Sequence, residues 1–216
     1  MRELPILMNG AMVRAVLEGR KTVTRRLVKR QPFVHHWQMF PEYTGQWREG
    51  AGLWRFEHRI PHNPRPDFEE WLRPPCQIGE RLYVRETHFD GRNLNEGRVL
   101  FQADGDMSRF GWTPSLHMPK ALARIWLEVT AVRVERVRDI TAEQAIAEGM
   151  QSNLREHDAV ESLRNDFAQL WNGLAKPGAR WDDNPWVWVV DFRRVEHVPG
   201  QITTNYRGYP MEAAKP

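Results

Sequence analysis

The sequence predicts an α+β domain built around a small β-barrel. Three observations support this class. Several segments alternate apolar and polar residues with the period of two that is typical of strands. Three other segments show the apolar spacing or the start and stop signals of helices. The order of the segments shows no regular strand–helix–strand alternation of the kind that builds a parallel sheet.

The first expected elements are a strand and a helix. Residues 4–8 form a short apolar run that is typical of a strand. Asn9 is a favourable N-cap for a helix over residues 10–18, in which apolar residues recur at helical spacing. Gly19 stands where a glycine usually ends a helix. A tight basic segment, residues 21–26, follows.

Residues 29–75 differ in character from the rest. Their periodicity is poor, and they are rich in proline, histidine and tryptophan. We therefore expect a long insertion or elaborated loop, not a second domain, and its aromatic content indicates that it is packed. The prolines are Pro32, Pro41, Pro61, Pro64, Pro66, Pro74 and Pro75.

The remaining strands and helices follow the insertion. Residues 77–80 predict a turn into a strand over 81–87, and a shorter strand is expected over 98–102. Residues 123–137 alternate strongly and predict one long bent strand or a strand pair. The last strand is expected over residues 186–195.

Two more helices are expected in the second half of the chain. One spans residues 139–150, with a capping box that starts at Thr141 and has Gln144 at its third helical position. An amphipathic helix is expected over residues 159–174. We interpret residues 1–198 as a single domain and residues 199–216 as a loose C-terminal tail.

Arginine and tryptophan are both frequent in the sequence. The formal net charge is +3 and the pI is about 9.2, and five of the 31 basic residues are lysine while the others are arginine. Arginine binds phosphate and stacks on bases, so this composition suits nucleic acid. The alternative is that a GC-rich genome supplies the arginines and that the ten tryptophans fill the core. Trp186 and Trp188 share one strand face, where they either close the core or stack a base.

The sequence indicates a cytoplasmic protein. No apolar run approaches the roughly 18 residues of a membrane helix, so no membrane partner is expected. The apolar stretch within residues 1–10 is too short for a signal peptide, and an acid and a proline interrupt it. The single cysteine, Cys76, fits a reducing compartment.

Lys21 and Thr24 are the first candidate catalytic residues. A threonine hydroxyl becomes a good nucleophile only when a base removes its proton, and a lysine can be that base if burial or neighbouring cations lower its pKa. Arg20, Arg25 and Arg26 supply such neighbours. Residues three apart in an extended segment point to opposite faces, so the pair requires a turn or a bulge. The alternative is a solvated basic loop.

Two carboxylates are candidate proton donors. Glu148 stands at the end of an expected helix, just before Gly149, and Glu86 lies in an expected strand next to Arg85. An amide or ester that is cut needs a donor for its leaving group. The alternatives are an exposed helix residue for Glu148 and an ion pair with an arginine for Glu86. The sequence leaves both the catalytic and the structural interpretation of each glutamate open.

No metal or cofactor is expected. His58, His62 and Cys76, with His35 or His36 nearby, are conceivable zinc ligands, but the segment is rich in proline and contains no Cys-x-x-Cys pair. The chain has no Gly-x-Gly-x-x-Gly, P-loop or Gly-x-Ser-x-Gly pattern. This weighs against a dinucleotide enzyme, a P-loop NTPase and an α/β-hydrolase.

Several of these segments together resemble the ASCH domain family of the PUA-like superfamily. Residues 19–26 (GRKTVTRR) are similar to the family's Gly-x-Lys-Thr signature, and residues 78–87 (IGERLYVRET) are similar to a strand of its prophage-encoded branch. The resemblance continues in residues 123–137, 140–150 and 184–192 and leaves residues 29–75 uncovered. It implies a PUA-like β-barrel with flanking helices and a cleft.

The resemblance also implies an activity. Small bacterial ASCH enzymes hydrolyse the amide of N4-acetylcytidine, and their catalytic lysine base, threonine nucleophile and glutamate proton donor correspond to Lys21, Thr24 and Glu148. This chain is about twice the size of those enzymes. We expect the substrate-binding residues to be the polar neighbours in the two motifs, which are Arg20, Thr22, Arg26, Arg85 and Glu86.

The expected function is therefore an amidohydrolase that removes the acyl group from N4-acetylcytidine-like nucleosides. Its expected partner is a modified nucleoside or RNA, with no cofactor and no metal. Three alternatives stay open: a non-catalytic module that binds RNA or another nucleic acid, a ribonuclease that uses Lys21 and a carboxylate, and a phage structural role. Salt dependence separates them, because binding of a charged polymer weakens steeply with salt.

Overall fold

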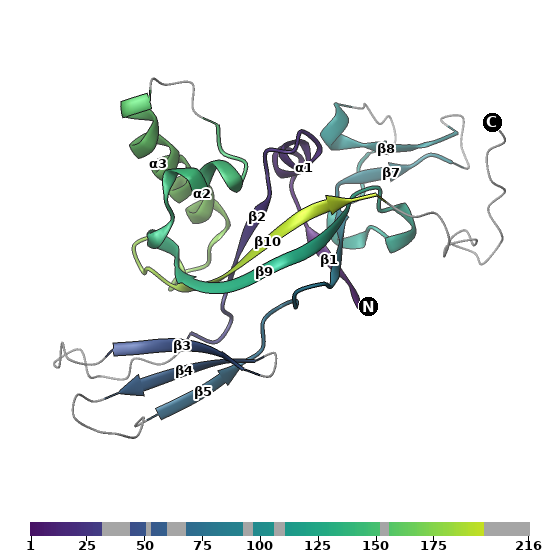
Figure 1. Ribbon diagram of the computed structural model, residues 1–216. Coiled ribbons are helices and arrows are strands. Elements are labelled where there is room, and N and C mark those ends of the chain that lie inside the picture. Colours follow the sequence, from purple (N-terminus) through teal and green to yellow (C-terminus); the bar gives the residue numbers. More distant parts are fainter. Residues whose placement is uncertain are drawn as a thin grey trace.

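A five-stranded sheet forms the centre of the protein. The computed structural model describes residues 1–31, 44–50, 53–59, 68–92, 97–105, 111–151 and 156–196. The strand order is β1–β6–β9–β10–β2, and all neighbours are antiparallel except β1 and β6 (Figure 1). The strands are β1 (Glu3–Leu7), β2 (Val23–Leu27), β6 (Arg81–Arg85), β9 (Trp126–Arg136) and β10 (Trp186–Val195).

The predicted α+β class is confirmed by this sheet and the helices beside it. The pairings show an order with β1 and β2 at its two ends, and they do not show a closed barrel, so closure stays a prediction. The region 123–137 forms the single strand β9, which pairs with β10 over its whole length apart from a register shift at Asp191. Such a shift is typical of a bulge that bends a strand.

Local sequence signals position two of the described α-helices. The Asn9 side chain accepts the amide of Met12 at 2.9 Å and starts α1 (Gly10–Leu17), and Gly19 follows that helix with a φ of 74°. The predicted capping box at the start of α2 (Ala142–Ala147) is confirmed, because Thr141 and Gln144 each accept the other's backbone amide. The third helix is α3 (Glu156–Leu174).

Strand β10 separates two apolar clusters. Its alternate residues point to opposite faces of the sheet. Val190 and Phe192 pack in the cluster that α1 covers, and Val187 and Val189 pack in the cluster that α2 and α3 cover. Figure 1 shows the last two helices together on one side of the sheet. The sheet therefore fixes α1 and α2 relative to each other from opposite faces.

The region between β2 and β6 contains a second sheet. Its antiparallel strands are β3 (Thr44–Gly50), β4 (Leu53–Arg59) and β5 (Phe68–Leu72), and Figure 1 shows them as a layer below the central sheet. Trp54 meets Trp188 edge-on at 6.1 Å, and Phe56 meets Trp186 at 5.9 Å. These aromatic contacts attach the second sheet to β10.

Short elements complete the described chain, and no separate prediction was made for β7. They are β7 (His88–Asp90), β8 (Val99–Phe101) and the 3₁₀ turns η2 (Gln102–Asp104), η3 (Ser115–His117), η4 (Lys120–Leu122) and η5 (Val137–Asp139). In the described ranges, no helix has the length and apolar character to cross a membrane. The expected tail, residues 199–216, lies outside the described residues.

The apolar core of the sheet stabilises the fold, and a substitution of Leu127 tests this. Its side chain is fully buried in the cluster under α1. We expect Leu127→Ala to lower the free energy of unfolding by about 2–5 kcal/mol, because it removes buried apolar atoms and leaves a cavity. Leu116→Ala is the matched control, because Leu116 is exposed. Urea unfolding measures both, and equal losses would contradict the assignment of Leu127 to the core.

Candidate functional site

The candidate site lies where the segment before β2 meets the end of α2. Three consecutive residues of the first segment bind three consecutive carbonyl groups of the second. The contacts are Arg20 Nη1 to Gly149 O at 2.9 Å, Lys21 Nζ to Glu148 O at 2.8 Å, and the Thr22 amide to Ala147 O at 2.9 Å. This ladder joins two segments that are about 127 residues apart in the chain.

Gly149 makes the close contact possible. Its φ of +98° lies in the region that favours glycine. A Cβ atom at this position would stand 2.9 Å from Cβ of Ala15 and 3.4 Å from Cβ of Lys21. The end of α2 can therefore approach α1 and Lys21 this closely only with a glycine at position 149.

Lys21 and Glu148 form a buried ion pair. The Lys21 side chain is fully buried, and its ammonium group donates to Glu148 Oε2 at 2.6 Å, to Glu148 O at 2.8 Å and to Val23 O at 2.8 Å. All three ammonium protons thus have acceptors. Burial lowers the pKa of Lys21, and the charge and the hydrogen bond of Glu148 oppose that shift. The alternative of a solvated basic loop is therefore wrong for Lys21.

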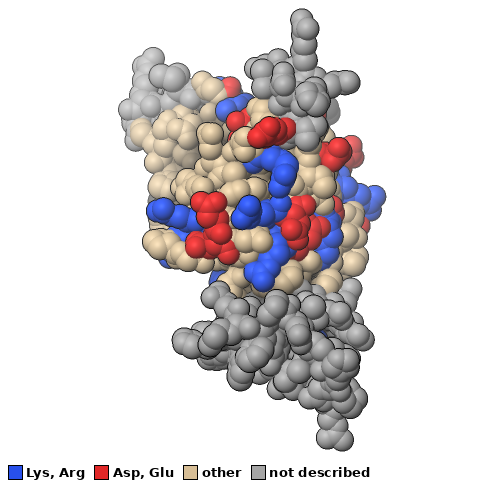
Figure 2. All heavy atoms as spheres, turned by 90° about the vertical axis from the view of Figure 1, so that its left-hand side faces the viewer, with Lys and Arg blue, Asp and Glu red and all other residues tan. Residues whose placement is uncertain are grey.

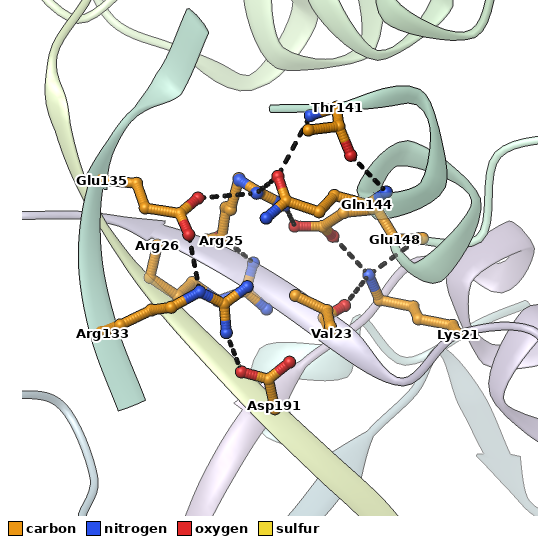
Figure 3. A network of polar contacts seen from close by, with 10 residues as sticks. All are labelled: Lys21, Val23, Arg25, Arg26, Arg133, Glu135, Thr141, Gln144, Glu148 and Asp191. Carbon is orange, nitrogen blue, oxygen red and sulfur yellow. Dashed lines mark hydrogen bonds and ion pairs between the residues drawn. The ribbon is translucent and has the colours of Figure 1, made fainter. Parts of the chain in front are cut away.

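Arg25 holds the other carboxylate oxygen of Glu148. Its Nη1 lies 3.4 Å from Glu148 Oε1, while its Nη2 donates to Gln144 at 2.8 Å and to Glu135 at 3.0 Å (Figure 3). Its guanidinium also lies 5.9 Å from the ring centre of Phe167. From the sequence alone, Arg25 is only a cation near Lys21. Its anchoring contacts cannot be predicted from spacing, because Glu135, Glu148 and Phe167 are far away along the chain.

The network continues along β9 and β10 to the surface. Arg133 donates to Glu135 at 2.6 Å and also pairs with Asp191 (Figure 3). Gln144 uses one oxygen for both Arg25 and the backbone amide of Thr141, so the capping box of α2 and the ion-pair network share an atom. The position of α2, and with it Glu148, is therefore tied to both strands.

Thr24 lies on the other face of β2, at the junction of two cavities. The smaller cavity has a volume of about 280 Å³ and is bordered by Thr24, Arg26 and Glu148 together with Phe167 and other apolar residues of α3. Lys21 does not line it. No hydrogen bond joins Lys21 to Thr24 among the described residues, as expected for positions three apart at the start of a strand.

The larger cavity is a cleft of about 1000 Å³ that borders both end strands, β1 and β2. Thr24 and Arg26 line it as well, beside Trp188 and Val190, which are their partners in the β2–β10 register. Arg26 donates to Leu7 O in β1 at 2.9 Å, and burial lowers its pKa. Arg26 thus bridges the two ends of the sheet at the point where the two cavities meet.

Two predicted substrate-binding residues lie elsewhere. Glu86 is buried and makes a two-pronged ion pair with Arg124, at 2.8 Å for each oxygen. Arg85 donates to Leu116 O at 3.0 Å and lies over Tyr83. Neither residue lines the two cavities or contacts Lys21. Glu86 therefore has the ion pair that its alternative interpretation expected. Substrate binding by Arg85 and Glu86 stays untested.

Arg20 and Thr22 contribute through their contacts with the end of α2. Arg20 also pairs with the exposed Glu18 at 2.5 Å, and the Thr22 residue is exposed. Neither lines either of the two cavities. Their geometry fits residues that fix the backbone around Glu148.

The described residues contain no group of three or more metal-binding side chains. Cys76 is buried and unoxidised, and burial raises the pKa of its thiol to about 12. His35, His36 and His62 lie outside the described residues, as does the side chain of His58. The zinc hypothesis thus rests on positions that the structure does not describe.

Comparisons with known proteins return one solved structure. No protein-family model and no curated protein matches the chain. The chain is similar to the crystal structure of an ASCH domain from Lactobacillus crispatus JV V101, with a TM-score of 0.38 and 12% sequence identity over 91% of this chain and 81% of that one. Its name is that of the family which the sequence motifs resemble.

Gly149 provides a test of the ladder. We expect Gly149→Ala to lower the free energy of unfolding by about 1–3 kcal/mol, because alanine is strained at this positive φ. A further loss is expected because the new methyl group would clash with Ala15. Gly178→Ala is the control, because Gly178 has a φ of 82° and open space at its Cβ. Thermal or urea unfolding compares the two variants. A loss at Gly149 no larger than that at Gly178 would contradict the close contact.

Proposed function

We propose that this protein is an amidohydrolase that removes the acyl group from an N4-acylated cytosine nucleoside such as N4-acetylcytidine. The observation that carries this proposal is the buried pair of Lys21 and Glu148 together with the small cavity that Glu148 and Thr24 both border. Of the three residues that the sequence resemblance assigns to catalysis, Thr24 and Glu148 border one cavity and Lys21 contacts Glu148. Thr24 is the nucleophile, Lys21 the base and Glu148 the proton donor.

The pair can supply both an acid and a base in one step. A direct contact of 2.6 Å lets Lys21 Nζ pass a proton to Glu148 Oε2. The products are a neutral amine, which can act as a base, and a protonated carboxyl, which can act as an acid. Burial penalises the charged ammonium group of Lys21 and so favours the neutral amine. The lowered pKa of Lys21 agrees with that direction.

The reaction then has two stages. Thr24 Oγ attacks the acyl carbon while Lys21 takes the hydroxyl proton, and Glu148 protonates the amine as the carbon–nitrogen bond breaks. This leaves an ester on Thr24, a protonated Lys21 and an ionised Glu148. Water then attacks the ester and gives a proton to Glu148, and Lys21 returns its proton to Thr24 Oγ. A carboxylic acid leaves and the starting state is restored.

One contact has to open before Lys21 can reach Thr24. All three protons of the ammonium group have acceptors, and one of these acceptors is the Val23 carbonyl. After the proton moves to Glu148, the amine keeps two protons, so it can turn without breaking all its hydrogen bonds. Substrate binding in the cavity beside Glu148 is the event that we expect to favour this turn.

The smaller cavity fits a nucleobase in size and lining. Its volume of about 280 Å³ is close to the lower bound for ligand pockets. Phe167, Leu170 and Trp171 supply an apolar wall, and Arg26 and Glu148 supply polar groups that can orient a base. The acyl carbon would then lie at Thr24, at the opening into the larger cleft.

Hydrolysis of N4-acetylcytidine by variants of Thr24 tests the assignment. We expect the wild type to release cytidine and Thr24→Val to lose at least about 100-fold in kcat/KM, because valine keeps the shape and removes the hydroxyl. The control is Thr130→Val, which changes an exposed threonine of β9. Chromatography of the nucleosides measures both. A folded wild type that releases no cytidine would sink the proposed substrate.

The pH dependence tests the shared proton. The active pair holds one proton, so kcat/KM should fall at alkaline pH when the pair loses it, with an apparent pKa below the usual lysine value of 10.5, because burial lowers the pKa of Lys21.

Glu148→Gln should reverse the direction of that alkaline change. Glutamine cannot donate the proton, which should cost about 100-fold or more. It also removes the carboxylate that raises the pKa of Lys21, so the remaining rate should rise with pH as Lys21 becomes a free base. The same alkaline fall in both proteins would contradict proton sharing.

A further inference from the structure

The larger cleft extends beyond the site of the proposed reaction. Thr24 lines it at one end of β2, and Val28, Lys29 and Arg30 line it beyond the other end. A strand advances roughly 3.3 Å per residue, so the four steps from Thr24 to Val28 span about 13 Å. This length covers several of the roughly 3.4 Å base steps of a stacked nucleic acid strand. One nucleoside at Thr24 would leave the outer part of the cleft free.

The outer end of the cleft has a rim of three cations, Lys29, Arg30 and Arg73. They come from the two chain segments that lead into and out of the second sheet. Arg30 is largely exposed and lies 2.7 Å from Glu70, but no ion pair links Lys29 or Arg73 to an acid in the ranges that the structure describes. The rim therefore carries a net positive charge.

The backbone under this rim is held in place. The Val28 amide donates to Trp186 O at 3.1 Å, and the Gln31 side chain exchanges two hydrogen bonds with the backbone of Trp186, at 2.7 and 3.0 Å. Lys29 and Arg30 thus lie between two positions that are fixed to β10. Cations on a fixed backbone present a defined spacing to an anionic ligand.

The wall between Thr24 and the rim is apolar and partly aromatic. Trp188 lies in it, held edge-on by Trp54, beside Leu27 and Leu72. An apolar, aromatic wall that ends in cations matches the two parts of a nucleotide, which are the base and the phosphate. By contrast, the face in Figure 2 shows basic and acidic side chains next to one another, which gives a polyanion no uniform attraction.

From these features we infer that Lys29, Arg30 and Arg73 bind the phosphates of a single-stranded nucleic acid that lies along the cleft. The nucleoside at Thr24 is then one residue of an oligonucleotide, and its neighbours lie against the wall and the rim. The identity of the group at Thr24 rests on the proposed function. The phosphate contacts at the rim do not, because they require no reaction.

Binding of an unmodified oligonucleotide tests the rim. The probe is a fluorescein-labelled hexamer of cytidylate RNA, and anisotropy titrations at several salt concentrations give the dependence of log K on log salt. Each phosphate contact on a single strand contributes about 0.7 to that slope. We expect the double variant Lys29→Ala/Arg73→Ala to bind more weakly and its slope to be smaller by about 1.4. Over a fourfold rise in salt, the wild type should therefore lose about sevenfold more affinity than the variant.

The control variant is Arg180→Ala/Arg194→Ala. It removes the same charge from two exposed arginines that line neither cavity, so the slope should stay near the wild-type value. Circular dichroism melts check that both variants fold. A wild type that does not bind the hexamer, or a rim variant with the slope of the control, would overturn the inference.

The same experiment separates this inference from the proposed reaction. The hexamer carries no acyl group, so its binding is measured whether or not the protein has amidohydrolase activity. If binding depends on the rim but cytidine is never released, phosphate binding at the rim is supported and the amidohydrolase proposal is contradicted. If free N4-acetylcytidine is hydrolysed but the hexamer does not bind, the amidohydrolase proposal is supported and phosphate binding at the rim is contradicted.

Discussion

The buried ion pair between Lys21 and Glu148 is the constraint on which the site depends. An ammonium group and a carboxylate lose their water when they are buried, and the loss is offset only if geometry and hydrogen bonds are nearly complete. Here the ammonium group has three acceptors, and Arg25 reaches the second carboxylate oxygen. Removing one partner would leave an uncompensated buried charge, which typically costs 3–5 kcal/mol. A substitution that removes the charge of either residue therefore destabilises the other.

This constraint extends into the fold through the backbone around it. The end of α2 can reach Lys21 only because Gly149 has no Cβ, and Arg20 and Thr22 hold the same turn from either side. Arg25, which contacts Glu148, also donates to Glu135 and so links the ion pair to β9. A shift of α2 would thus break contacts with two strands at once. The position of Glu148 is therefore fixed by contacts with β2 and β9 as well as by its own helix.

The sequence predicts those parts of the fold that depend on neighbours along the chain. Asn9, Gly19 and the Thr141 capping box act within one helical turn, and the structure confirms all three. The contact of Lys21 with Glu148 crosses 127 positions, so no spacing rule gives it, and only the family resemblance placed the two together. Strands β3 to β5 escaped prediction because the prolines of residues 29–75, which all lie outside the three strands, are typical of a loop.

The division between the two faces of β2 explains how a charged pair and a nucleophile can share a site. Side chains alternate along a strand, so Lys21 and Arg25 face α2 while Thr24 and Arg26 face the cleft. Arg25 and its partner Glu148 both line the small cavity beside Thr24, and Lys21 does not. A ligand in that cavity therefore meets Glu148 and Arg25 and not the lysine. Lys21 is shielded from solvent and has to leave the Val23 carbonyl before it can reach Thr24. Its pKa is set by burial, by Glu148 and by the neighbouring charges of Arg26 and Arg25.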